Sequence, residues 1–157
     1  MSETQISLFK DISIIIAGVI ALVTFATGVF QYIRQGNQIR ATQFIEMRRR
    51  FLEDPIFRNI LNLLATDDPG LSSVPIQDRR NLVGFLEEVA LMVNSRLIRP
   101  RVAQYMFGYY VILVDNSEHL WDGLDKGSIY WHVFNRFAQS IREMQKSPLP
   151  APKELEF

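Results

Sequence analysis

An uncharged apolar run at residues 12–33 constrains this chain more than any other feature of its sequence. The run has 22 residues, and its clearly polar side chains are Ser13, Thr24, Thr27 and Gln31. A helix of this length spans roughly 33 Å, slightly more than the hydrocarbon core of a bilayer. Inside lipid, a helix satisfies its own backbone polar groups. We therefore expect one transmembrane helix at residues 12–33.

The flanks of this run predict its orientation. Lys10 is the basic residue before it, whereas a series of arginines from Arg34 to Arg50 follows it. Basic residues favour the cytoplasmic side. We expect a short extracytoplasmic N-terminus at 1–11 and a cytoplasmic domain at 34–146, in the inner membrane of a bacterium. A cleaved signal peptide is the alternative, but such peptides have a shorter apolar core and a basic N-terminal region.

The remainder of the chain has the apolar spacing of amphipathic helices, which predicts an all-α fold. The first helix should run from about 8 to 53, with Gly36-Asn37 as a weak point. With the span, we expect a cytoplasmic bundle of about four to five helices. The expected later helices are 55–65, capped by Asp54, then 78–94, 100–116 and 129–146. The loops expected between them are 66–75 and 122–128, and a Pro-rich tail follows at 147–157.

The same spacing predicts which residues form the core. In the helix from Asp78, it selects apolar residues and leaves Arg79 and Arg80 off the core. The expected core positions of this helix are Leu82, Phe85, Leu86, Val89 and Val93. The helix at 100–116 should bury Val102, Tyr105, Met106, Tyr109, Ile112 and Leu113. The last helix should bury Ile129, Val133, Phe134, Phe137, Ile141 and Met144.

Bulk composition excludes several classes of protein. The formal net charge is zero, which argues against a protein that coats duplex nucleic acid. There is no cysteine, which removes disulfides, thiolate nucleophiles and thiolate metal sites. The basic residues are mostly arginine, whose planar guanidinium holds phosphates and carboxylates with two hydrogen bonds.

Arginine clusters are the candidate anion-binding residues. The first cluster is Arg48-Arg49-Arg50, with Arg40 eight residues before it. Such a stripe beside a span also attracts anionic lipid, at about 1 kcal/mol per charge near the surface. The second cluster lies at a turn between two helices, where free backbone N–H groups also attract anions. Its members are Arg96, Arg99 and Arg101. Arg136 and Arg142 are expected to pair with the acidic stretch from Asp115 to Asp125, within one chain or between chains.

Catalytic signatures are lacking. His119 and His132 have no second histidine at a metal-ligand spacing, and Glu87-Glu88 point about 100° apart on a helix. The acidic stretch does not match a calcium loop. We therefore expect no enzyme activity, no metal and no cofactor. An enzyme would need His119 or His132 beside a carboxylate in a cleft.

Small residues recur along the apolar run at spacings of four, three and four. They are Ala17, Ala21, Thr24 and Gly28. Small faces allow helices to pack closely in lipid. This stripe predicts self-association of the span and a homo-oligomer.

The order of segments resembles a large group of small bacterial membrane-anchored helical proteins. The resemblance rests on the single span, the segment QIRATQFIEMRRRFLEDPIFRNIL, and then FLEEVALMVNSRLI and MFGYYVILV. It covers about residues 12–144 and implies an all-helical cytoplasmic domain. The layout is also similar to prokaryotic antiviral effectors that sense a cyclic nucleotide and act at the membrane. That similarity implies an anionic small molecule or cyclic oligonucleotide as the ligand.

Two functions follow from these features. The first is a non-enzymatic membrane effector in bacterial defence or stress, which oligomerises and responds to an anionic ligand or partner. The second is a passive membrane anchor or accessory subunit that recruits a protein partner. An oligomer in mild detergent favours the first, and a monomer favours the second.

Overall fold

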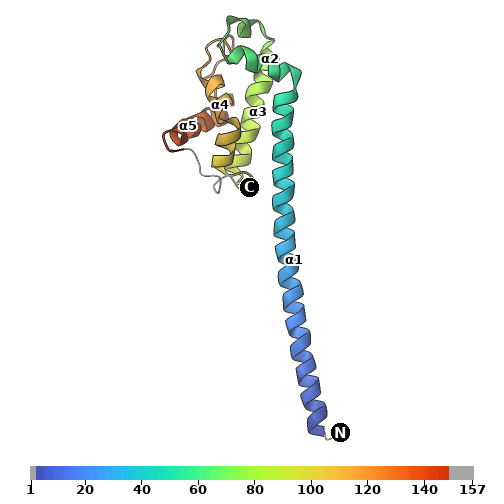
Figure 1. The fold of residues 1–157 in the computed structure, drawn as a ribbon. Coiled ribbons are helices and arrows are strands. Elements are labelled where there is room, and N and C mark those ends of the chain that lie inside the picture. Colours follow the sequence, from blue (N-terminus) through green and yellow to red (C-terminus); the bar gives the residue numbers. More distant parts are fainter. Residues whose placement is uncertain (1–2, 149–157) are drawn as a thin grey trace. The chain divides into compact units, whose positions relative to one another are not determined.

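A computed structural model of the chain describes residues 3–148, and residues 1–2 and 149–157 lie outside the described part. The described residues contain five α-helices, two 3₁₀ helices and no strand (Figure 1). The α-helices are α1 (Glu3–Glu53), α2 (Pro55–Leu64), α3 (Ile76–Asn94), α4 (Pro100–Asn116) and α5 (His132–Gln145). The 3₁₀ helices are η1 (Pro69–Ser73) and η2 (Ile129–Trp131). The all-α prediction is confirmed for these residues, whereas most of the predicted tail at 147–157 lies outside them.

Helix α1 continues through Gly36 and Asn37, so the weak point expected there does not end it. The chain divides into two compact units, 1–39 and 40–157. In the first unit, every side chain described from Ile16 to Gln35 is exposed. Helix α1 is the one helix of the described residues that is long and apolar enough to cross a membrane.

Local signals explain where the helices of the second unit begin. Asp54 Oδ1 accepts hydrogen bonds from the backbone N–H groups of Ile56 (2.8 Å) and Phe57 (3.0 Å), which are otherwise unpaired in the first turn of α2. Pro100 occupies the first turn of α4, where a missing N–H costs nothing. The cap of Asp54 and the start of α4 were both expected from the sequence.

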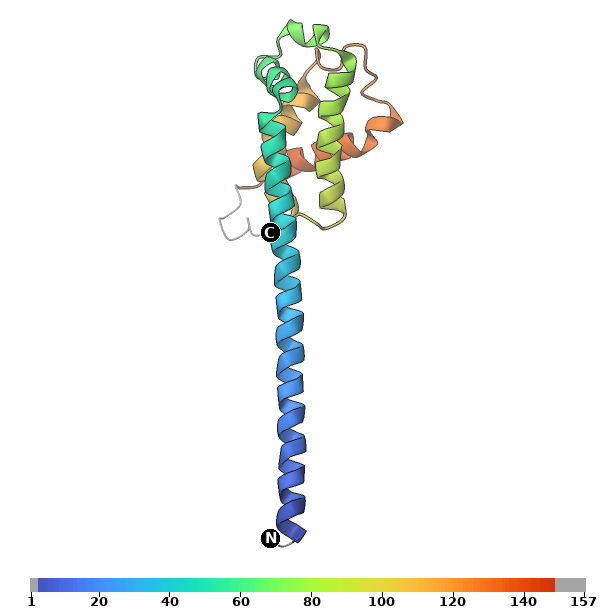
Figure 2. The same cartoon turned by 90° about the vertical axis from the view of Figure 1, so that its right-hand side faces the viewer.

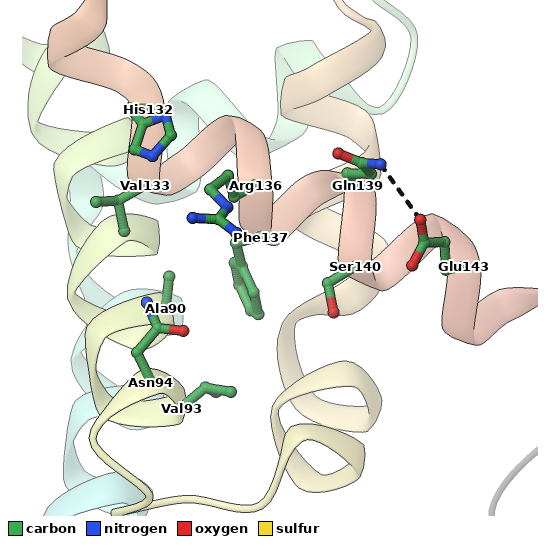
Figure 3. Close-up of a pocket in the computed structure, with 10 residues that line it drawn as sticks. All are labelled: Ala90, Val93, Asn94, His132, Val133, Arg136, Phe137, Gln139, Ser140 and Glu143. Carbon is green, nitrogen blue, oxygen red and sulfur yellow. Dashed lines mark hydrogen bonds between the residues drawn. The ribbon is translucent and has the colours of Figure 1, made fainter.

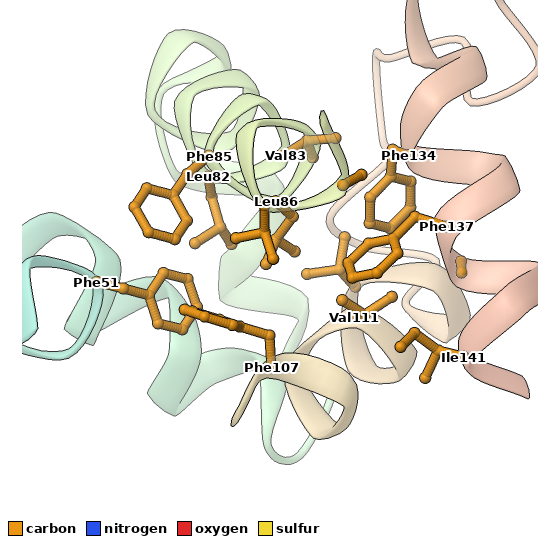
Figure 4. Close-up of a cluster of buried hydrophobic side chains, with 14 of the residues drawn as sticks. Phe51, Leu82, Val83, Phe85, Leu86, Phe107, Val111, Phe134, Phe137 and Ile141 are labelled. Atoms are coloured by element: carbon orange, nitrogen blue, oxygen red, sulfur yellow. The ribbon is translucent and has the colours of Figure 1, made fainter. Parts of the chain in front are cut away.

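The core of the second unit is built from all five α-helices and includes a cluster of phenylalanine rings. Phe51 of α1 stacks on Phe85 of α3, with ring centroids 4.9 Å apart, and meets Phe107 of α4 edge-to-face at 5.4 Å. Figure 4 shows these rings on one side of Leu86, with Phe134 and other α5 side chains on the other. The last turns of α1 are therefore part of the core.

The buried face predicted for the last helix is confirmed at Phe134, Phe137 and Ile141, but two predicted faces are wrong in part. Helix α4 buries Phe107, Gly108 and Val111, while Tyr105 and Tyr109 are exposed. This helix is apolar on most sides, so spacing alone does not select the face, and Gly108 admits α5 because an added Cβ there would lie 3.3 Å from Ile141. The predicted last helix begins at His132 rather than 129. Ile129 consequently lies in η2, where 83% of its surface is exposed.

Candidate functional site

A groove of about 460 Å³ runs over the outer face of α3. Gln77, Asn81, Gly84 and Glu88 recur along α3 at spacings of four, three and four, which places them on one side of the helix. An added Cβ at Gly84 would meet no atom within 4 Å, so the groove is open at that position. The other lining residues are Arg50, Asp54, Phe57, Arg80, Phe85 and Trp131.

The guanidinium groups of two arginines of this groove, Arg50 and Arg80, make no hydrogen bond or ion pair with the residues that the structure describes. The two acids that line the groove differ in whether their side chains are hydrogen-bonded. Asp54 is engaged as the cap of α2, whereas Glu88 is exposed. Two cations beside the aromatic rings of Phe57 and Trp131 suit an anionic group that also carries an apolar surface.

The three arginines of the predicted triplet have different surroundings in this structure. Arg50 lines the groove, whereas Arg49 is exposed and bound to Glu46, with Nη2 and Oε1 2.6 Å apart. The hydrogen bond from Arg49 lowers the pKa of Glu46. Arg48 is half-buried, and its buried Nε makes no hydrogen bond within the described residues. Arg40 is also half-buried on α1.

The second predicted cluster lies at the turn between α3 and α4 and is not part of the groove. Arg96 has a positive φ of 56° just after the end of α3, and Arg99 precedes the first residue of α4. Arg101 donates from Nη1 to Gln104 Oε1 at 3.2 Å. Arg96 and Arg99 are exposed, and the structure brings none of the three arginines together with Arg50.

Arg79 is a structural residue, and the prediction that it lies off the core is wrong. It was expected off the core but is only 4% exposed. Its Nη1 donates to the backbone carbonyls of Leu120 (2.8 Å) and Asp122 (2.7 Å), and its Nε donates to that of Val74 (3.1 Å). A buried guanidinium with several acceptors can remain charged in the interior. Arg79 therefore fastens the segment after α4 to the start of α3.

That segment, residues 117–131, is held at several further points. Trp121 is buried, and its Nε1 donates to Val114 O at 2.8 Å. Lys126 Nζ lies 2.6 Å from Asp115 Oδ1, and Arg142 also binds Asp115. The expected pairing of Arg142 with the acidic stretch is thus confirmed within one chain. Burial raises the pKa of Asp115, but hydrogen bonds from Lys126 and Arg142 outweigh it and hold that pKa below its ordinary value.

A second groove, of about 500 Å³, lies between α3 and α5 and contains His132 (Figure 3). Its acid, Glu143, lies three turns along α5 from His132 and accepts a hydrogen bond from Gln139 Nε2 at 3.3 Å. Within the described part of the chain, neither His132 nor His119 is hydrogen-bonded to a carboxylate. The described residues contain no group of acids and histidines that could hold a metal ion.

The small residues of the apolar run, Ala17, Ala21, Thr24 and Gly28, are all exposed. The hydroxyl of Thr24 donates to Ile20 O at 2.8 Å, so its polar group is satisfied within the helix. The hydroxyl of Thr27 likewise donates to Val23 O at 2.9 Å. Neither threonine therefore presents an unsatisfied hydroxyl on the exposed surface of this stretch.

Comparison with known proteins adds no family to this picture: no protein-family model, no curated protein and no solved structure matches the chain.

Proposed function

We propose that this protein is a non-enzymatic, membrane-anchored binding module. The observation that carries the proposal is the apolar part of α1, where large hydrophobic side chains such as Leu22, Phe25 and Phe30 are at least 67% exposed. Full burial of one such side chain is worth about 1.5–3 kcal/mol, so water is a poor solvent for this surface. A bilayer is the solvent that this stretch fits in length, in polarity and in the internal bonding of its hydroxyls.

In this proposal the span crosses the inner membrane of a bacterium. The helices that follow it form a bundle in the cytoplasm, because most of the basic residues near the span follow it. The module assembles as a homo-oligomer through the small face of the span. It responds to an anionic ligand or partner, which binds the arginines Arg50 and Arg80 of the groove over α3. Ligand binding can shift the assembly only by its differential affinity for two states.

Anchoring is tested by alkaline extraction of membranes from cells that express the full chain. We expect the chain to stay in the membrane pellet, and the pair Ile20→Arg and Val23→Arg to release it or lead to its degradation, at a cost of about 2.5–3.5 kcal/mol for each buried arginine. The matched control is Ile45→Arg with Ile56→Arg, which changes two exposed apolar residues of the second unit. A wild-type chain found free of membranes without detergent would contradict the proposal.

The binding role is tested with purified protein in detergent and two anionic probes, a fluorescent cyclic dinucleotide and phosphatidylglycerol vesicles. The double change Arg50→Gln and Arg80→Gln should weaken binding at least tenfold, because a hydrogen bond to a charged group is worth about 1.5–3 kcal/mol. Arg49→Gln is the matched control, because Arg49 is already bound to Glu46. Equal binding by all three proteins would remove the groove from the proposal.

The alternative function is a passive anchor that recruits another protein. Exposed hydrophobic residues on the second unit favour it, Ile129 and Tyr130 above all, each 83% exposed. In that case, the solubilised protein should be a monomer, and a different membrane or cytoplasmic protein should copurify with it in a manner that depends on Tyr130.

A further inference from the structure

Among the described residues of the second unit, the most exposed hydrophobic side chains follow a segment that is held by hydrogen bonds and an ion pair. Ile129 and Tyr130 are each 83% exposed, although η2 follows a segment that is fastened by Arg79, Trp121 and Lys126. The backbone N–H of Tyr130 is bonded to Ser128 Oγ at 3.4 Å. We call residues 122–130 the acidic finger. Figure 2 shows its orange ribbon projecting from the body on the side of α3 away from the last turns of α1.

The outward charge of the acidic finger is negative. Asp122 and Asp125 are exposed, whereas the positive charge of Lys126 is paired with Asp115. Lys126 also lies over the ring of Trp121, 5.8 Å from its centroid. The finger thus offers two carboxylates next to two exposed apolar side chains.

The groove over α3 has the opposite character. It offers the guanidinium groups of Arg50 and Arg80 without ion-pair partners among the described residues, against one exposed carboxylate, that of Glu88, and it has an aromatic lining that includes Phe57. At Gly84 no side chain obstructs the approach of another chain. Charge and polarity therefore match between the finger and the groove.

The finger and the groove are neighbours on the same molecule. Arg80 and Trp131 line the groove and also line a smaller cavity at the base of the finger, together with Tyr130. A projection and a complementary recess side by side are the requirement for an isologous contact, in which a two-fold axis places each projection in the recess of the other copy.

We propose that the acidic finger of one copy docks in the groove over α3 of a second copy, with Ile129 and Tyr130 against the aromatic lining and the finger carboxylates facing Arg50 and Arg80. This inference rests on the proposed role of the groove as a binding site for an anionic partner. Confinement of both copies to one membrane raises their effective concentration, so a contact of modest area suffices.

Cysteine cross-linking tests the contact in the full-length chain, because the natural sequence has no cysteine. One chain carries Gly84→Cys and the other carries Tyr130→Cys, with different tags, so any mixed disulfide joins two copies. We expect mixed disulfide in membranes under mild oxidation. Ser95→Cys, at the exposed residue after α3, replaces Gly84→Cys in the control and should cross-link at least fivefold less.

Two further comparisons test the apolar and the charged parts of the contact. Ile129→Asp in the Tyr130→Cys chain should reduce the mixed disulfide at least fivefold, whereas Ile45→Asp, at another exposed apolar residue, should not. Arg80→Glu in the Gly84→Cys chain should also reduce the mixed disulfide, and Asp125→Arg in the Tyr130→Cys chain should restore it.

Equal cross-linking by the Ser95→Cys control would overturn the proposal, as would a yield that does not respond to Ile129→Asp. Cross-linking of Tyr130→Cys to a different protein, with none to Gly84→Cys, would also overturn it. In each of these cases, anchoring and the binding of anionic probes by Arg50 and Arg80 are measured separately, so the proposed function is judged by its own experiments.

Discussion

At the scale of single residues, two adjacent arginines at the start of α3 have opposite roles. Arg79 is buried and bonded to backbone carbonyls of two segments, whereas Arg80 is exposed in the groove. Sequence spacing placed both outside the core, because a charged residue is rarely buried without partners. Two of the partners of Arg79, the backbone carbonyls of Leu120 and Asp122, lie more than forty positions along the chain, and no residue type in the sequence indicates them.

Arg79→Met should destabilise the second unit by about 2–4 kcal/mol, because it keeps the apolar stem and leaves buried carbonyls without donors. The measurement is urea unfolding in detergent followed by tryptophan fluorescence, since Trp121 and Trp131 both lie in this unit. Arg80→Met is the matched control and should change the free energy of unfolding by less than about 0.5 kcal/mol. Equal losses would contradict the role given to Arg79.

Asp115 makes stability depend on pH. Its folded-state pKa lies below its unfolded value, so the unfolded state binds more protons as the solution is acidified. The contribution of Asp115 is therefore fully present above its unfolded pKa and is lost as pH falls through the folded-state pKa. Asp115→Asn should cost about 1–2 kcal/mol at neutral pH, since Lys126 and Arg142 are partly screened by solvent.

The cost of Asp115→Asn should shrink on acidification, as the pH falls from the ordinary pKa of an aspartate towards the lower folded-state pKa of Asp115. Unfolding curves at several pH values measure it, with the exposed Asp122→Asn as the control. A cost that stayed constant or grew on acidification would show that the charge of Asp115 is not what stabilises the fold.

At the scale of elements, most helices could be predicted from the sequence because their signals are local. Asp54, Pro55 and Pro100 fix the starts of α2 and α4 with their own side chains or rings. The start of α5 depends on a distant residue. Glu87 Oε1 of α3 accepts a hydrogen bond from the backbone N–H of Phe134, at 3.0 Å, in the first turn of α5. Apolar spacing alone predicts a helix that begins at Ile129. It therefore does not indicate that Ile129 and Tyr130 belong to the acidic finger.

Glu87→Gln should therefore destabilise α5 by about 1 kcal/mol, because a carboxylate near a helix N-terminus is replaced by a neutral amide. The neighbouring Glu88→Gln is the matched control, since Glu88 is exposed and bonded to no helix terminus in the described residues. Hydrogen exchange of the first turns of α5 is the most direct measurement. Equal protection in the two variants would contradict the assignment of Glu87 as the cap.

At the scale of the candidate site, the sequence indicated arginine chemistry but not which arginines meet. Arg50 was expected to act with Arg48 and Arg49, yet successive residues of a helix point about 100° apart. The groove instead combines Arg50 with Arg80, thirty positions away on another helix. Only packing of α1, α2 and α3 brings these side chains to one surface, and a single sequence carries no signal for that pairing.

At the scale of the whole molecule, the proposed anchoring predicts that the small face of the apolar run decides how copies meet within lipid. Gly28→Ile should lower the oligomer fraction in mild detergent, because bulk on this face separates the helices. Ala26→Ile adds a similar side chain about 200° away around α1 and should leave the oligomer fraction unchanged. Mass measurement of the solubilised protein distinguishes these results. Loss of oligomer in both variants, or in neither, would contradict a specific packing face.

The contribution of α1 to the phenylalanine cluster has a consequence for turnover of the protein. Phe44 and Phe51 are fully buried, so the end of α1 also closes the hydrophobic interior of the second unit. Proteolysis between Phe44 and Phe51 would remove the ring of Phe44 from that interior, and proteolysis after Phe51 would remove both rings, at a cost of about 3–5 kcal/mol for each. Release of a folded fragment is thereby restricted to cleavage upstream of Phe44. A cut further along would make shedding and unfolding a single event.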